Sequence, residues 1–349
     1  MTRLITNNPK RPFKKALGYA EGAEVYAKLR ADVTEAGILK RAYWYYSFIT
    51  LTDIGLFLFC TYLLTAQNNL IITILSIIGI AFFSVRMGGL IHDAAHRAIF
   101  KSVALNDAFG YISAFMLAFP YRVWRVKHNA HHAHTNEEGE DPDIEVPISF
   151  TETTFQRNTF VVKAIRKNQA WLYYVLGPLL SFSIRIKSFR YYSANFKGKI
   201  PLEVVVLVFG LIIWYVVPFF VFPFWKSILF LVIVNALAGF YMLNIFAPNH
   251  KGMPYLAKGV KFSFLEHQIL TARNLYSHWL TDYVYLGLNY QIEHHLFPDC
   301  PRNKLPLITP YVKKICKKYG MTYTETSIVE TNKIIYRELK KVSRTAQVS

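Results

Sequence analysis

The stretch VVVLVFGLIIWYVVPFFVFPFW, residues 204–225, is separated by Lys226 from the stretch SILFLVIVNALAGFYMLNIFA, residues 227–247. Both stretches are uncharged, and each is close to the roughly 20 residues that a helix needs to cross a bilayer. A similar pair lies between Ala42 and Val85, where Asp53 is the only charged residue and the polar break QNN, residues 67–69, divides the run. The sequence therefore predicts an all-α integral membrane protein with four transmembrane helices in two hairpins, at about 42–66, 70–91, 204–225 and 227–247.

The rest of the chain is expected to form a polar amino-terminal segment, residues 1–41, and a cytosolic helical cap, residues 92–203 and 248–349. Residues 42–349 would then be one membrane domain. Two shorter apolar stretches, Val103 to Pro120 and Trp171 to Ser183, contain or adjoin charged residues, and we expect both at the membrane interface. Glu21 to Leu39 could form an amphipathic helix on the membrane surface or an ordinary solvated helix.

The charge distribution predicts the orientation of the spans. Lys and Arg outnumber Asp and Glu by 40 to 22, and the predicted hairpin tips carry only Lys226. Because positive charge stays on the cytoplasmic side, both termini and the cap are expected in the cytoplasm, on a bacterial inner membrane or the endoplasmic reticulum. Residues 1–41 lack the apolar core of a signal peptide. The three cysteines have no CxxC spacing and indicate neither a disulfide framework nor a zinc site.

Histidines are clustered beside the apolar stretches. Eight of the eleven stand in three motifs and one isolated position, namely His92 and His96; His128, His131 and His132; His294 and His295; and His250. Residues three and four apart share one helical face, so each motif presents its imidazoles together, and Gln291 takes the first position of the third motif. A crossing at 103–120 would place the first two motifs on opposite sides of the membrane, which is a further reason to expect that stretch at the interface.

Imidazole suits zinc, copper, iron and nickel, and eight such ligands are too many for one tetrahedral ion, so we predict two metal ions. Metal-bound histidines need partners for their other ring nitrogen. The candidates close in sequence are Asp93, Asp141, Asp143, Glu293 and Asn289, each of which could instead be a surface group or a helix cap. His134, His267 and His278 are expected on the surface or behind the ligands.

These motifs resemble those of the membrane fatty acid desaturases. The strings that carry the resemblance are HDAAH (92–96), KHNAHH (127–132) with the following HTN and DPD, and LNYQIEHHLFP (288–298), and the similarity runs from about Ala42 to about Tyr323. The glutamine of QIEHH resembles the front-end subgroup, which inserts a double bond between the carboxyl end and an existing double bond. His250 resembles a further ligand that follows the last span in this family.

The resemblance implies two iron ions, dioxygen as co-substrate and an acyl substrate carried by coenzyme A, acyl carrier protein or a lipid. The implied iron ligands are His92, His96, His128, His131, His132, His250, His294 and His295. Gln291 could bind iron directly, act through water or orient a neighbour. Residues 1–41 contain no HPGG haem motif, so we expect a separate electron donor of the ferredoxin or cytochrome b5 type, steered by the basic face. Membrane lipid is an expected partner and nucleic acid is not.

Other functions fit the sequence less well. A metalloprotease needs Glu after the first histidine of its helix motif, where this chain has Asp93. A metal or proton transporter predicts ionisable groups near the bilayer midplane, where Asp53 is the main candidate. A hydroxylase or an acetylenase could use the same histidines. Six basic side chains could bind the phosphates of the acyl carrier: Arg122, Arg125, Lys127, Arg185, Lys187 and Arg190. The same residues also fit a simple positive-inside orientation signal.

Overall fold

The computed structural model describes residues 17–144, 148, 150–151, 160–195, 198 and 201–345. The described residues are mostly helical, as predicted, and they divide into two compact units. Unit 1 comprises Met1–Lys40, Lys127–Val175 and Ile245–Ser349, and unit 2 comprises Arg41–Val126 and Leu176–Asn244. Both units are therefore assembled from segments that are distant in the sequence.

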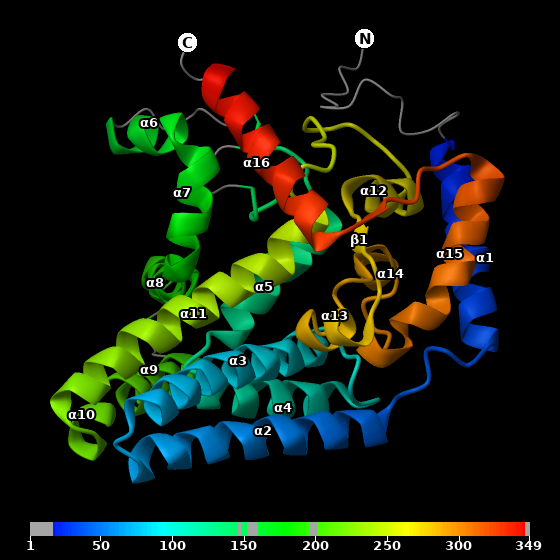
Figure 1. Ribbon diagram of the computed structural model, residues 1–349. Coiled ribbons are helices and arrows are strands. Elements are labelled where there is room, and N and C mark those ends of the chain that lie inside the picture. Colours follow the sequence, from blue (N-terminus) through cyan, green and yellow to red (C-terminus); the bar gives the residue numbers. More distant parts are fainter. Residues whose placement is uncertain are drawn as a thin grey trace. The chain divides into compact units, whose positions relative to one another are not determined.

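Unit 2 holds most of the apolar helices (Figure 1). Its elements are α2 (Tyr43–Ala66), α3 (Leu70–Ala95), α4 (Val103–Met116), η1 (Gly177–Leu179), α8 (Leu180–Ala194), α9 (Leu202–Tyr215) and α10 (Pro218–Val221), with the first parts of α5 (Tyr121–Ala133) and α11 (Phe224–His250). Helix α3 packs against both α2 and α4, and α4 also contacts α9.

Four helical segments in the described part of the chain are long and apolar enough to cross a membrane. They are Tyr43–Ala66, Leu70–Ala95, Leu202–Val221 and Phe224–His250, close to the four predicted spans. The third is broken where α9 ends and α10 begins at Pro218, since a proline cannot continue the helical hydrogen bonds. The second and fourth run beyond the apolar residues and carry His92 and His250 in their last turns. A fifth candidate arises if α4 and α5, bent by 114°, are taken as one span.

Polar side chains in unit 2 satisfy helix ends and one another. The Asn69 side chain caps α3 by accepting from the backbone N–H groups of Ile71 and Ile72. Lys226, expected at an open hairpin tip, is instead buried, and its Nζ donates to the carbonyl of Leu64 at 2.9 Å. Asp53 forms a buried ion pair with Arg86 at 2.7 Å.

Unit 1 contains the shorter helices. Its elements are α1 (Tyr19–Glu35), α6 (Phe160–Lys167), α7 (Gln169–Leu176), α12 (Phe264–Thr271), α13 (Trp279–Val284), α14 (Gln291–Leu296), η2 (Arg302–Lys304), α15 (Leu305–Tyr319) and α16 (Ile328–Thr345), with the parallel strand pair β1 (Asn274–Leu275) and β2 (Glu325–Thr326). The side chains of Ser263 and Glu266 form a capping box at the start of α12.

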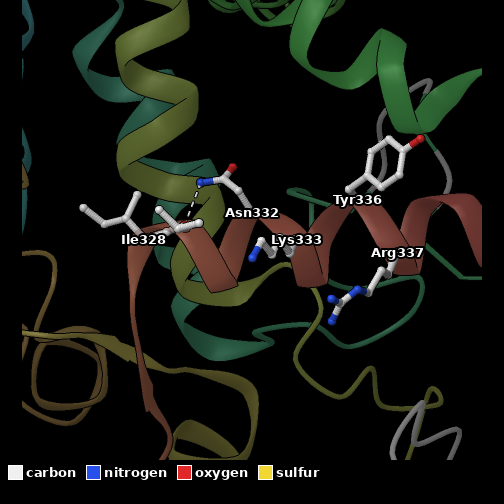
Figure 2. Close-up of a pocket in the computed structure, with 6 residues that line it drawn as sticks. Ile328, Asn332, Lys333, Tyr336 and Arg337 are labelled. Carbon is white, nitrogen blue, oxygen red and sulfur yellow. Dashed lines mark hydrogen bonds between the residues drawn. The ribbon is translucent and has the colours of Figure 1, made fainter.

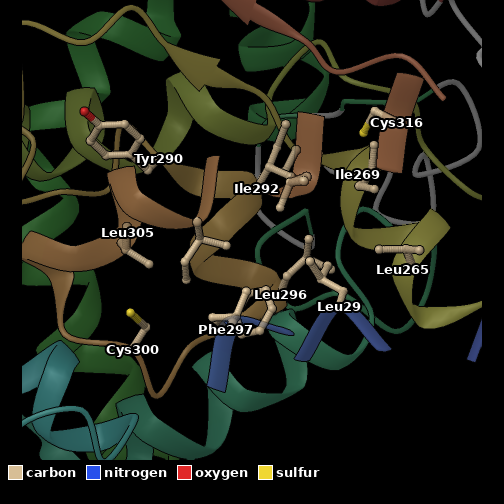
Figure 3. Packing of buried hydrophobic residues seen from close by; sticks show 14 of the residues in the cluster. Leu29, Leu265, Ile269, Tyr290, Ile292, Leu296, Phe297, Cys300, Leu305 and Cys316 are labelled. Atoms are coloured by element: carbon tan, nitrogen blue, oxygen red, sulfur yellow. The ribbon is translucent and has the colours of Figure 1, made fainter. Parts of the chain in front are cut away.

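The core of unit 1 surrounds α14, which carries the third histidine motif. Figure 3 shows Ile292 and Leu296 of α14 packed among apolar side chains from α1, α12 and α15. Helix α1 contributes Leu29, which is 1% exposed, and the Tyr26 hydroxyl donates to the carbonyl of Leu296 at 2.7 Å. The apolar face of the helix expected at Glu21 to Leu39 is therefore used for packing inside unit 1.

Candidate metal centre

Three buried histidines of unit 1 converge from three helices. His131 lies near the end of α5, His250 in the last turn of α11 and His295 in α14. They offer ligand nitrogens within 4.8 Å of one another, and the His131 and His250 rings lie 4.8 Å apart. We call them the first histidine group. Three imidazole donors are a set that several transition metals accept.

Each ring of this group has an oxygen acceptor at its Nδ1. His131 Nδ1 lies 3.0 Å from a carboxylate oxygen of Asp141, and His250 Nδ1 lies 3.0 Å from the carbonyl oxygen of Thr271. His295 Nδ1 lies 2.7 Å from Gln268 Oε1. Carboxylate and carbonyl oxygens accept hydrogen bonds, so each Nδ1 donates a proton and the lone pair lies on Nε2. This is the arrangement that metal-bound histidines normally show. For His250 this Nε2 lies 2.8 Å from the amide nitrogen of Gln291.

A second histidine group in the same unit comprises His128, His132 and His294. Their ligand nitrogens also lie within 4.8 Å of one another, and Nε2 of His128 is 3.1 Å from Nε2 of His132. Two nitrogens that bind one ion at right angles, each at about 2.1 Å, lie roughly 3 Å apart. The spacing therefore fits a shared metal ion. The predicted count of two ions agrees with two histidine groups in unit 1.

His92 and His96 lie at the end of α3 in unit 2. Their rings are 4.7 Å apart, and His92 Nδ1 is 3.0 Å from Asp93 Oδ1. The Tyr46 hydroxyl donates to the other oxygen of Asp93 at 2.7 Å. Asp93 thus contacts a predicted ligand from its buried side, as a residue that fixes the imidazole would.

The other predicted neighbours of the third motif lie in different directions. Gln291 is buried, with its amide nitrogen 2.8 Å from Nε2 of His250. Asn289 donates to Asp282 at 2.7 Å. Glu293 accepts hydrogen bonds from Asn274 at 2.7 Å and from the Tyr323 hydroxyl at 2.6 Å, which ties α14 to β1. Of these three side chains, Gln291 is the one seen in contact with a predicted ligand.

Asp141 is held in place by the chain that follows α5. It is fully buried, and its two oxygens accept from the backbone N–H groups of Asn136 and Asp143, both at 2.8 Å. Burial alone would raise the pKa of the Asp141 carboxyl, but its interactions with His131 and Lys251 lower it. The neighbouring Asp143 pairs with Lys127 at 2.5 Å. Asp141 is therefore a preorganised anionic partner for His131.

The fatty acid desaturase family model matches residues 68–327. The chain belongs to the fatty acid desaturase family. As a desaturase it is an oxidoreductase that acts on fatty acyl chains.

Several curated desaturases are similar to this one. It is 27% identical over 368 residues to a delta(8)-fatty-acid desaturase of Euglena gracilis, a match that covers 99% of this chain and 85% of the relative. It is 31% identical over 252 residues to an acyl-lipid 8-desaturase of Rebecca salina, covering 70% of this chain and 57% of the relative. A delta(5) fatty acid desaturase of Caenorhabditis elegans is 29% identical over 317 residues, covering 85% and 69%. The chain thus spans between 57% and 85% of the length of these three relatives.

Some of the desaturase's basic residues are committed to partners within the protein. In unit 2, Arg185 donates to the carbonyls of Leu117 and Ala118 at the end of α4, at 3.1 and 3.0 Å, and Arg125 pairs with Asp107. In unit 1, Lys127 pairs with Asp143, as described above. Arg125, Lys127 and Arg185 therefore have partners within the protein, and phosphate binding by these residues stays a prediction beside the orientation-signal reading.

Three residues that sequence reasoning missed hold the first histidine group. Thr271 and Gln268 contact the rings of His250 and His295 directly. Arg273 is 1% exposed, its Nε donates to the carbonyl of Pro248 at 2.6 Å, and its Nη2 donates to the carbonyl of Lys251. Arginine satisfies the free carbonyls at a helix C-terminus, so Arg273 fixes the turn that carries His250. These residues follow no spacing rule, and no motif in the sequence marks them.

The three remaining histidines lie as the sequence suggested. His267 Nε2 is 2.7 Å from the carbonyl oxygen of Thr135, which follows the second motif. His134 contacts Glu137 at 2.9 Å, and the His278 side chain caps α13. His267 therefore supports the segment behind the ligands, whereas His134 and His278 have local partners.

Proposed function

We propose that this desaturase inserts a double bond into a fatty acyl chain by using dioxygen and two iron ions bound by imidazoles. The observation that carries the proposal is the pair of histidine groups in unit 1, in which the first group has each Nδ1 held by an acceptor. Imidazole donors suit iron, and a metal site requires ligand imidazoles whose second ring nitrogen is held by a hydrogen bond.

The ligands are assigned from geometry and from the motifs. His131, His250 and His295 would hold one ion, and His128, His132 and His294 would contribute to the other. His92 and His96 are assigned to the same centre by their place in the first motif. The Gln291 amide nitrogen lies 2.8 Å from Nε2 of His250, the nitrogen that would bind the first ion, so the Gln291 side chain would have to turn aside when the ion is bound.

The metal and dioxygen supply the oxidising power to remove hydrogen from an unactivated methylene, which no side chain has. The chain's own residues bind the metal and set its environment. Asp141, Thr271 and Gln268 keep the ligand rings in one tautomer and one orientation. Burial of His131, His250 and His295, each 4% exposed or less, keeps bulk water from the first ion.

The balance of the reaction requires an electron donor. Removing two hydrogens from the acyl chain supplies two electrons, whereas reducing dioxygen to two waters takes four. Two electrons must therefore come from a donor, for which we propose a separate acidic ferredoxin or cytochrome b5. We further propose a front-end double-bond position, an acyl substrate carried by coenzyme A, acyl carrier protein or a lipid, and a multi-pass membrane placement with both termini cytoplasmic.

The experiment is expression in a host of defined fatty acids, followed by mass spectrometric localisation of double bonds. The wild-type chain should yield acyl products with a new double bond between the carboxyl end and an existing one. The His131→Ala variant should yield none, whereas His278→Ala, at a histidine outside both groups, should match the wild type. Hydroxylated or triple-bonded products would show hydroxylase or acetylenase activity in place of desaturation. An unchanged lipid profile would contradict any oxidation of acyl chains.

A further inference from the structure

Helices α6, α7 and α16 of unit 1 share an exposed face that mixes large apolar and basic side chains. Phe160, Val161, Trp171, Val175 and Val329 are between 64% and 85% exposed. We call the exposed side of these three helices the α16 face. Soluble surfaces seldom gather so many large apolar side chains without a partner.

The face is one continuous surface within unit 1. The ring of Trp171 in α7 meets the ring of Tyr336 in α16, with centroids 5.6 Å apart. The Tyr174 hydroxyl donates to the carbonyl of Asn332 at 3.2 Å, and the Gln169 side chain donates to the carbonyl of Leu339 at 3.1 Å. Helix α6 also contacts α16. The apolar side chains of α6 and α7 therefore lie beside the charges of α16.

A shallow hollow of about 460 Å³ lies on α16. Figure 2 shows Lys333 and Arg337 projecting from the same side of the helix, while Tyr336 points toward the neighbouring helix. The hollow is lined by Ile328, Val329, Asn332, Lys333, Tyr336 and Arg337. Its walls thus combine branched apolar groups with an ammonium and a guanidinium.

The charge of the α16 face is strongly positive. Across α6, α7 and α16 the sequence has eight Lys and Arg, of which Arg166 is buried, and two Glu. Glu330 is shared between Arg337 at 3.3 Å and Lys333 at 4.0 Å, so one acid faces two bases. The face is therefore complementary to an anionic partner.

We propose that the α16 face lies on the membrane surface and that Lys333 and Arg337 bind the phosphate of an anionic phospholipid. Amphipathic helices with basic residues beside Trp, Phe and Val bind at the boundary between headgroups and acyl chains. Tyr and Trp prefer that boundary, and guanidinium and ammonium groups pair with phosphate there. A soluble acidic protein would match the charge alone, whereas a membrane also takes up the exposed apolar side chains. The inference does not depend on the oxidation chemistry.

The test places a fluorophore on Val329→Cys in the full chain, in nanodiscs of phosphatidylcholine with or without phosphatidylglycerol. Nitroxide lipids report contact with the membrane, and aqueous iodide reports contact with water. The unsubstituted chain, labelled in the same way, gives the background from native cysteines. Two double variants carry the same charge change, K333E/R337E on the α16 face and K317E/K318E on exposed positions of α15. Thermal unfolding and iron content confirm that each variant is folded.

We expect nitroxide quenching and protection from iodide, both stronger with phosphatidylglycerol. K333E/R337E should weaken the preference for the anionic lipid by about tenfold or more, because each basic group contributes roughly fivefold in affinity. K317E/K318E should leave it unchanged. Iodide quenching without nitroxide quenching would overturn the proposal. Nitroxide quenching that is unchanged in K333E/R337E would overturn the headgroup site. Protection from iodide that appears only when an acidic ferredoxin is added would assign the face to the electron donor.

Discussion

Replacing Asp141 by Asn separates the charge of this side chain from its shape. Each Asp141 oxygen accepts one backbone N–H, from Asn136 or from Asp143, and both also face Nδ1 of His131. An amide has one accepting oxygen, so either orientation of Asn turns its NH₂ toward a buried N–H. A buried donor left without an acceptor costs about 1–3 kcal/mol, and loss of a charged partner removes about 1.5–3 kcal/mol from the bond to His131.

The assay measures iron per chain and the thermal unfolding midpoint in parallel. Asp141→Asn should lower the unfolding midpoint and weaken iron binding by roughly 10- to 100-fold, the usual effect of losing the residue behind a metal-bound histidine. Glu140→Gln is the matched control, because Glu140 forms an exposed ion pair with Lys258 at 2.7 Å and does not touch a histidine in the described contacts. Iron content and stability equal to the wild type in Asp141→Asn would refute the reasoning.

Three further predictions follow from other contacts. Arg273→Met should lower iron content and thermal stability because it removes the donors to the last turn of α11. Arg273→Lys should restore part of both. Equal iron content in the wild type, Arg273→Met and Arg273→Lys would contradict this role for Arg273. Gly239→Ala should destabilise the chain by about 1–3 kcal/mol because the added Cβ would lie 2.5 Å from the carbonyl oxygen of Pro178. Gly55→Ala is the control: its Cβ would enter open space, so thermal unfolding should show a stability equal to or above that of the wild type. Chelation of iron should abolish product formation and ferrous iron should restore it; activity that survives complete removal of iron would contradict an iron enzyme.

Helical spacing placed the histidines of each motif close together but did not predict the two histidine groups, because His131 and His295 join the first group whereas their motif neighbours join the second. Residues three and four apart on α5 and α14 do present their imidazoles together, because both segments are helical as predicted. His250 stood alone in the sequence, beside an apolar stretch but in no motif, and the structure brings it to His131 and His295. The helices that are long and apolar enough to span a membrane were also predicted to within a few residues, since long uncharged runs leave few alternatives.

The groups that orient the histidines could not be predicted, because they act through tertiary contacts. Thr271 uses its backbone carbonyl, which has no sequence signature, and Arg273 reaches helix carbonyls from a segment without a motif. Lys226 was expected at a hairpin tip and Arg185 as a phosphate contact or an orientation signal, and both donate to carbonyls at helix ends. Charge counts along the sequence cannot distinguish a solvated cation from one that caps a helix.

The most direct measurement of the central claim is the iron content of the chain, purified without oxygen and analysed by elemental analysis with Mössbauer spectroscopy. Two histidine groups predict two iron ions per chain in nitrogen-rich sites, with one ion lost when His131, His250 or His295 is replaced by Ala. A wild-type chain that binds a single ion, or that binds zinc in place of iron, would contradict the account.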